Sequence, residues 1–178
     1  MLDHLQDRRS QRTRAALNTA FLELLMEQGY EALKLSAVAQ RANVGRSTCY
    51  EHYRTKHDLL KASIAAPFST LADLAGDSAQ DENVSVLLRH FRDNQHVARV
   101  LLAWPTRPLL GDTLAAAIAL RLERHPPTLL SLPIVVLARQ IADAQLSLLD
   151  SWLTGRQRFE LDVAANALRL STRALAQH

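Results

Sequence analysis

Apolar residues recur every three or four positions through the first part of the chain, the spacing that places them on one face of an α-helix. Gly29 directly follows one such run over residues 13–28, and glycine commonly forms a left-handed stop at a helix C-terminus. The pattern therefore predicts a first amphipathic helix that Gly29 ends. Its apolar positions are Ala16, Leu17, Ala20, Phe21, Leu24 and Leu25.

A second and a third helix are predicted next, and both are short. The segment 35–42 (LSAVAQRA) places apolar residues on one face, and the segment 46–53 (RSTCYEHY) forms the helix after it. The link between them begins with Asn43, and asparagine is the non-glycine residue type that best tolerates positive φ. Two short helices joined by a tight turn, with small alanines where they cross, are typical of a helix-turn-helix.

A fourth helix is predicted from about Lys56 to Leu74. The polar stretch that follows, GDSAQDEN at 76–83, is typical of a loop between domains. Asn83 is placed to cap the helix that comes after the loop. That helix is predicted over residues 84–103.

Prolines limit the next two helices. The helix over 84–103 must stop before Pro105, because proline disfavours helical geometry in the residue that precedes it. A further helix over 111–124 ends before His125, Pro126 and Pro127 for the same reason.

The last two helices, predicted over 133–154 and 159–176, differ from the others. In the first, apolar residues point in nearly every direction, and a helix of this kind is buried on two sides. The second is rich in alanine, so another helix could approach it closely. These features favour a dimer interface of two helices from each subunit over an intramolecular core. The narrow polar stripe of the first helix consists of Arg139, Asp143, Ser147 and Asp150, of which Arg139 and Asp143 are expected to form a surface pair.

Composition agrees with an all-α protein. The chain has 178 residues, 48% of them hydrophobic, which is enough for a real core. The single cysteine, Cys49, excludes an internal disulfide and a zinc site of paired thiolates. The polar, basic N-terminus and the lack of an apolar run of ~20 residues indicate a cytoplasmic protein that is neither exported nor embedded in a membrane.

The net charge of +3 is unevenly distributed. Between Lys34 and Lys56 there is one acid, Glu51, among several bases, and such a local excess attracts a phosphate backbone. The bases in and upstream of this segment are Arg8, Arg9, Arg12, Arg14, Lys34, Arg41, Arg46, Arg54 and Lys56.

The run from Gly29 to Leu60, GYEALKLSAVAQRANVGRSTCYEHYRTKHDLL, resembles the DNA-binding domain of the TetR family of transcriptional regulators. The most specific part of the resemblance is the spacing of Tyr50, His52, Tyr53 and Lys56. The resemblance implies a three-helix DNA-binding domain at 9–69, with its helix-turn-helix at about 33–52. A helical ligand-binding and dimerisation domain is expected at 70–178. This sequence departs from the family pattern with Lys34 for threonine, Asn43 for glycine, Cys49 for a larger apolar residue and Tyr53 for phenylalanine.

The third helix should lie in the major groove with its N-terminal residues on base edges. Arg46 is the predicted base reader, because its planar fork can span O6 and N7 of guanine. Ser47 and Thr48 can bond to bases or phosphates, and Lys34 can meet a phosphate. By resemblance, Tyr50 and Lys56 hold phosphates, and Lys56 begins a helix whose N-terminal amides favour an anion. Two alternatives stay open for His52, contact with phosphate or packing against the first helix, and packing is favoured; Cys49 and Tyr53 are expected in the core.

The resemblance further implies a repressor that binds a palindromic operator as a homodimer and is released by a small-molecule effector. Candidate pocket residues are His90, Phe91, Trp104 and Trp152, although plain packing is the better interpretation for any one of them.

Two other classes of protein were weighed. An enzyme is disfavoured because no metal-ligand spacing, glycine-rich phosphate loop or nucleophile elbow is present, and no cofactor is expected. The rival that stays open is a helical ligand-binding or protein-interaction module whose helix-turn-helix no longer binds DNA, because of Lys34 and Asn43.

Overall fold

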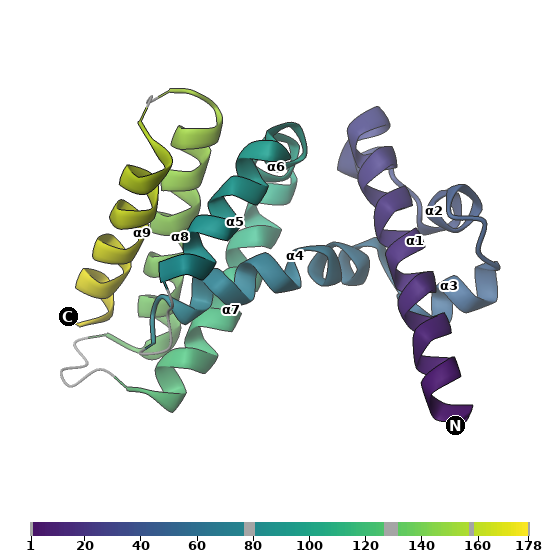
Figure 1. Ribbon diagram of the computed structural model, residues 1–178, viewed down its shortest axis with the longest axis horizontal. Helices are drawn as coiled ribbons and strands as arrows, with labels where there is room; N and C mark the ends of the chain where they lie inside the picture. Colours follow the sequence, from purple (N-terminus) through teal and green to yellow (C-terminus); the bar gives the residue numbers. More distant parts are fainter. Residues whose placement is uncertain (1, 77–80, 127–131, 157–158, 178) are drawn as a thin grey trace. The chain divides into compact units, whose positions relative to one another are not determined.

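The computed structural model describes residues 2–76, 81–126, 132–156 and 159–177. Within these ranges every regular element is a helix, which confirms the all-α prediction. The chain forms two compact units, an N-terminal unit over Met1–Ile64 and a C-terminal unit over Ala65–His178 (Figure 1). The division falls inside one helix, as does the predicted domain boundary at residue 69.

The N-terminal unit contains α1 (Leu2–Ala32), α2 (Leu35–Arg41), α3 (Arg46–His52) and the first half of α4 (Lys56–Asp73). The four helices share one apolar core, because each turns its periodic apolar face inward. The core includes Leu17, Phe21, Leu25, Leu33, Val38, Ala39, Cys49, Leu59 and Leu60, all at most 2% exposed.

The first helix differs from the prediction at both ends. It begins at Leu2, well before Thr13. The polar first turns carry hydrogen bonds between side chains one turn apart, from Gln11 to Asp7 at 3.2 Å and from Arg14 to Ser10 at 3.0 Å. Gly29 interrupts the helix with positive φ as predicted, but its φ of 76° and ψ of 169° lie in an extended region that only glycine enters readily, not in the left-handed helical region.

The turn between α2 and α3 is as expected. Asn43 has a φ of 53°, the positive value predicted for it. The Asn43 and Val44 amides donate to the carbonyls of Gln40 and Ala39, so two carbonyls near the end of α2 are paired within the turn. The predicted helix-turn-helix is therefore present.

The C-terminal unit contains α5 (Asp81–Asp93), α6 (Gln95–Leu102), α7 (Thr106–Arg124), α8 (Ile134–Leu153), α9 (Leu161–Ala176) and the second half of α4. In Figure 1, α8 lies between α7 and α9, and it packs against both. Its buried residues, among them Leu137, Ile141, Leu146 and Leu149, supply the middle of the core.

The predicted single helix over 84–103 is wrong, since the structure has two helices that break at Asn94. The Asn94 side-chain nitrogen donates to the His90 carbonyl at 2.9 Å, a local bond that competes with continued helix. Asn83 lies inside α5 and does not cap it. The loop predicted at 76–83 lies partly outside the described residues.

The helix predicted to begin at Gly111 begins earlier, at Thr106. Thr106 is 1% exposed, and its hydroxyl donates to the Leu101 carbonyl at the end of α6 at 2.7 Å.

Two further helix ends were predicted. The stop before Pro105 is confirmed, because α6 ends at Leu102. The last helix begins at Leu161 and not at Phe159.

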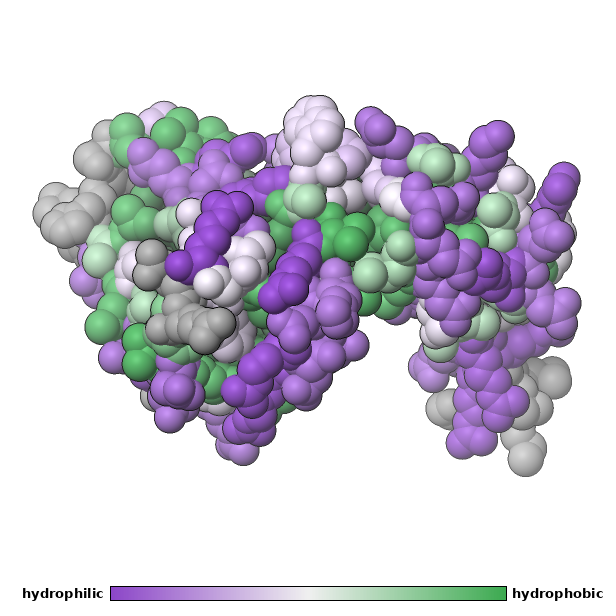
Figure 2. Space-filling view, turned by 90° about the horizontal axis from the view of Figure 1, so that it is seen from above, coloured by the Kyte–Doolittle hydropathy of each residue, from purple (hydrophilic) through white to green (hydrophobic). Residues whose placement is uncertain are grey.

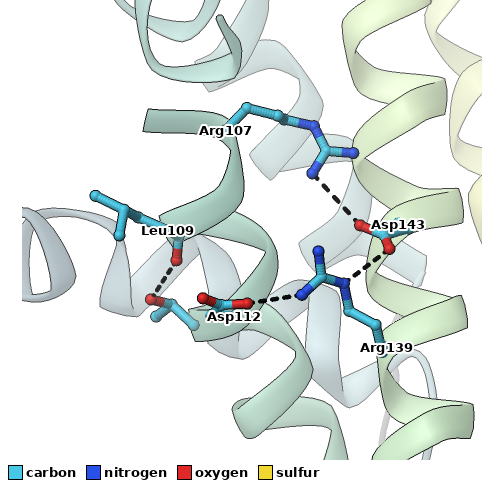
Figure 3. Close-up of polar contacts among 6 residues, drawn as sticks. Arg107, Leu109, Asp112, Arg139 and Asp143 are labelled. Carbon is cyan, nitrogen blue, oxygen red and sulfur yellow. Dashed lines mark hydrogen bonds and ion pairs between the residues drawn. The ribbon is translucent and has the colours of Figure 1, made fainter. Parts of the chain in front are cut away.

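Four charged residues link α7 to α8 in an alternating chain (Figure 3). Arg139 donates to Asp112 at 2.6 Å and to Asp143, one turn further along α8, at 2.8 Å. The other oxygen of Asp143 lies 3.5 Å from Arg107. The pairing of Arg139 with Asp143 was predicted, whereas the partners on α7 were not.

Candidate nucleic-acid interface

The third helix separates its residues into an inner and an outer face. Cys49 is fully buried and Tyr53, directly after the helix, is 8% exposed, so both predicted core positions are confirmed. Burial raises the pKa of the Cys49 thiol and of the Tyr53 hydroxyl. The two residues anchor α3 to the rest of the N-terminal unit and thereby turn its opposite face to solvent.

The outer face carries the residues predicted to meet DNA. Arg46 and Ser47 occupy the first turn of α3 and are exposed, and Thr48 is half-buried. Tyr50, one turn after Arg46, is 48% exposed, which is unusual for a large aromatic residue. These side chains are therefore exposed on one face of α3, two of them at its N-terminal end.

Lys34 lies at the N-cap position of α2 and is exposed. Its side chain makes no cap hydrogen bond, while its backbone carbonyl accepts from the amides of Ala37 and Val38. The ammonium is therefore available to solvent beside the helix-turn-helix. His52 is half-buried, and its ring centroid lies 6.2 Å from that of Tyr53.

Two basic residues of the segment have partners inside the N-terminal unit. Arg41 donates to Glu27 through both terminal nitrogens, at 2.8 and 2.7 Å, and to Glu23 at 3.3 Å. These bonds raise the pKa of Arg41 further and hold the pKa of Glu27 below its ordinary value. The pairing was missed from sequence, although two glutamates one turn apart on an exposed helix face are a signal for an arginine partner.

Lys56 is the second of these residues. Its ammonium donates to the backbone carbonyls of Tyr30 at 2.8 Å and Glu31 at 2.9 Å, and it lies 4.7 Å from the centre of the Tyr30 ring. Within the described part of the chain, the exposed cations Lys34, Arg46 and Arg54 have no comparable partner.

In Figure 2, hydrophilic side chains cover most of the visible surface of the N-terminal unit, at the right of the view.

The four residues predicted to line a ligand pocket are spread over α5, α8 and the link between α6 and α7 in the C-terminal unit. His90 and Phe91 are neighbours on α5, and the His90 ring nitrogen lies 3.3 Å from the Asn94 side-chain nitrogen. Trp104 lies between α6 and α7 with 79% of its surface exposed. Trp152 on α8 is half-buried, and its indole nitrogen donates to the Phe159 carbonyl at 3.1 Å.

The described residues contain no group of three or more histidine, cysteine, aspartate or glutamate side chains that could hold a metal ion. None of the helices, over the same residues, is long and apolar enough to span a membrane.

Comparisons with known proteins agree with the helix-turn-helix geometry. Residues 18–63 match the family model described as bacterial regulatory proteins, tetR family. The HTH-type transcriptional repressor KstR of Rhodococcus jostii (strain RHA1) is 28% identical, with 97% of this chain and 87% of that protein covered. The uncharacterized HTH-type transcriptional regulator YxbF of Bacillus subtilis (strain 168) is 40% identical over 68 residues, so the chain covers only 18% of its length.

A solved structure extends the likeness over both units. The TetR transcriptional regulator from Streptococcus agalactiae 2603V is 28% identical and superposes with a TM-score of 0.59, with 96% of this chain and 98% of that chain covered. The matched N-terminal helices, the exposed outer face of α3 and this full-length likeness agree with one another. Residues 18–63 therefore form a helix-turn-helix domain of the tetR family, and over its full length the chain is similar to transcriptional regulators of that family.

Proposed function

We propose that this protein is a transcriptional repressor that binds a palindromic DNA operator as a homodimer and leaves it when a small-molecule effector binds. The observation that carries the proposal is the outer face of α3, where Arg46, Ser47 and Tyr50 are exposed while the opposite face is anchored in the core. A rigid helix with free polar side chains at its N-terminal end is suited to base reading in the major groove.

In this proposal the residues have separate roles. Arg46 reads a guanine through its planar fork, and Ser47 and Thr48 bond to bases or nearby phosphates. Tyr50 and Lys34 contact phosphates, which set the position of the helix but carry no sequence information. His52, whose ring lies beside that of Tyr53, packs at the edge of this surface. Lys56 is a different case, because its ammonium already has partners.

A homodimer through the last two helices is supported by the outward face of α9. Val163 and Leu170 are 55% and 60% exposed, and Ala167 and Ala174 continue the same stripe at helical spacing. On α8, Val136 is 42% exposed. Apolar side chains reach the surface at the left of Figure 2, on the side where α8 and α9 lie in Figure 1. Two copies joined here could present two α3 helices to half-sites about 34–36 Å apart.

The effector part of the proposal rests on the family resemblance. An effector in the C-terminal unit would act by favouring an arrangement of the dimer that does not fit both half-sites, which is a shift of population. His90, Phe91, Trp104 and Trp152 are the proposed ligand contacts. Because the chain has only two tryptophans, their fluorescence is a direct readout for a screen of small molecules.

The test of DNA binding is a selection of bound fragments from a pooled genomic library, made with the full chain at low salt. We expect enrichment of fragments that share a palindrome, with affinity falling steeply as salt rises. If no fragment is enriched, the protein is a helical module whose helix-turn-helix no longer binds DNA.

The role of Arg46 is tested by repeating the selection with Arg46→Ala. We expect the motif to lose one strongly preferred base in each half-site, with a loss of about 1–3 kcal/mol of discrimination there. The matched control is Arg54→Ala, which removes the same charge from an exposed position outside α3. This control should leave the motif unchanged, and an equal loss of base preference in both variants would contradict the assignment.

A further inference from the structure

The partners of Lys56 are backbone carbonyls at the end of α1. Tyr30 and Glu31 follow Gly29, the residue that interrupts the helix, and belong to the last turn before α1 ends at Ala32. Carbonyls in the last turn of a helix have no partner within the helix, and they carry the negative end of its dipole. An ammonium that donates to two of them at 2.8 and 2.9 Å satisfies both and stabilises this helix end.

The Tyr30 side chain completes the site. Tyr30 is 9% exposed, and the face of its ring lies 4.7 Å from the Lys56 ammonium, within the range of a cation–π interaction. A lysine ammonium has three hydrogens to donate. Two of them are used by the carbonyls, and the ring covers a further side of the group.

The first turn of α4 also has its own anion. The Asp58 carboxylate accepts from the Thr55 amide and hydroxyl, both at 2.9 Å, and the Asp58 amide donates to the Thr55 hydroxyl oxygen at 3.1 Å. This reciprocal arrangement is a capping box, with aspartate in the place of the usual glutamate. A carboxylate therefore already occupies the helix end at which a phosphate was predicted.

We propose that Lys56 is a positioning residue, which latches the start of α4 to the end of α1 and so fixes the placement of α3 without contacting DNA phosphate. Residues 33–55, which include α2 and α3, lie along the chain between the two latched ends. A second contact, from the Ser63 hydroxyl to Asn18, ties the same two helices further along. The segment that contains the reading helix is thus held between two helices joined at two points. The consequence for DNA binding rests on the proposed function.

A lysine footprint tests the latch in the unmodified protein. The chain has only three lysines, Lys34, Lys56 and Lys61, so acetylation by acetic anhydride can be followed at each by mass spectrometry. In the free protein we expect Lys56 to react at least severalfold more slowly than Lys61, which is exposed on the same helix. Reaction of Lys56 at the rate of Lys61 would overturn the proposal.

Salt dependence distinguishes a latch from a phosphate contact. In Lys56→Met we expect affinity for the selected operator to fall roughly two- to thirtyfold, the range for residues that act without touching the ligand. The slope of log K against log salt should stay unchanged. A slope reduced in magnitude by about 0.9 for each subunit would show a lost phosphate contact and overturn the proposal. Lys61→Met is the matched control, with the same charge removed from α4 and affinity expected to stay within about threefold.

The two measurements separate the latch from the proposed function. If the unmodified protein binds no DNA, the proposed function fails, and the footprint of the free protein still decides whether Lys56 is engaged. If Lys56→Met does not fold, the same footprint decides. A Lys56 that is protected in the free protein but whose removal lowers the salt slope exchanges carbonyls for phosphate on DNA, and that result also overturns the proposal.

Discussion

Asn43 is the residue on which the turn of the helix-turn-helix depends. Its φ of 53° is a conformation that most residue types adopt only at a cost, whereas asparagine and glycine enter it readily. Asparagine can therefore form this turn at the position where the sequence resemblance leads one to expect glycine. The replacement of glycine by Asn43 changes the residue type at this position but does not abolish the turn.

Replacement of Asn43 gives a direct test of this explanation. We expect Asn43→Ala to lower the free energy of opening of α2 and α3 by about 1 kcal/mol, because alanine is strained at positive φ. Asn43→Gly should change it by only a few tenths of a kcal/mol, up or down, since glycine fits the turn but is freer in the unfolded chain. Amide hydrogen exchange of the full chain measures both. Equal losses in the two variants would mean that an asparagine side-chain contact, and not φ, stabilises the turn.

The charges of the N-terminal unit show what single residues do not reveal in sequence. Arg41 and Lys56 were counted with the bases that attract phosphate, and both have partners on α1, 14 to 26 positions away along the chain. The free cations of the segment are Lys34, Arg46 and Arg54, within the part of the chain that the structure describes. A count of charges along the sequence therefore overstates the number of cations that are available to a partner in this segment.

At the scale of the element, α4 begins with a titratable cap. Hydrogen bonds from Thr55, with desolvation acting against them, hold the pKa of Asp58 below its ordinary value. Because the pKa of Asp58 is lower in the folded state, the cap stabilises the folded protein at pH values above the unfolded pKa of about 4. This contribution is lost as pH falls through the lower, folded pKa.

Asp58→Asn should reveal this dependence. We expect its melting temperature to lie below that of the unmodified protein at about pH 6, and the difference to shrink as pH approaches about 3. Thermal unfolding followed by circular dichroism over this range measures it. The control is Glu51→Gln, which removes an exposed acid of α3 that has no hydrogen bond or ion pair within the described chain. A difference for Asp58→Asn that does not depend on pH would contradict the role of the carboxylate.

Helix type was predictable for every described element, whereas several helix ends were not. The apolar period of residues 84–103 continues through Asn94, so nothing in the spacing marks the helix break there. At this break the Asn94 side chain donates to the His90 carbonyl. The first turns of α1 are polar and have no period, yet they are helical. Periodicity reports which face will be buried, and it is silent where a helix is exposed all round or where a local polar bond ends it.

At the scale of the whole molecule, the proposed dimer interface gives a prediction of its own. We expect Leu170→Glu to weaken the dimer at least thirtyfold, because it places a charge in the centre of an apolar contact worth about 2 kcal/mol or more. Sedimentation analysis of the purified chain measures the change. Binding to a full palindrome should fall with it, while weak binding to a half-site remains.

Leu120→Glu is the matched control for this interface. Leu120 on α7 is 51% exposed, close to the 60% of Leu170, and it lies outside the last two helices. The control should leave the dimer intact. A dimer that survives Leu170→Glu, or one that Leu120→Glu dissociates, would place the interface elsewhere.

The sequence alone determined the helical class, the helix-turn-helix, the positive φ of Asn43 and the inward position of Cys49 and Tyr53. These follow from interactions within a few residues along the chain, so spacing and residue type are sufficient to predict them. Only the tertiary structure decided that Arg41 and Lys56 are engaged with α1, where α1 and α7 begin, and that α5 and α6 are separate. These features depend on partners far along the chain or on hydrogen bonds specific to one site. The sequence alone cannot distinguish a lysine ammonium that contacts a phosphate from one, like that of Lys56, that donates to backbone carbonyls.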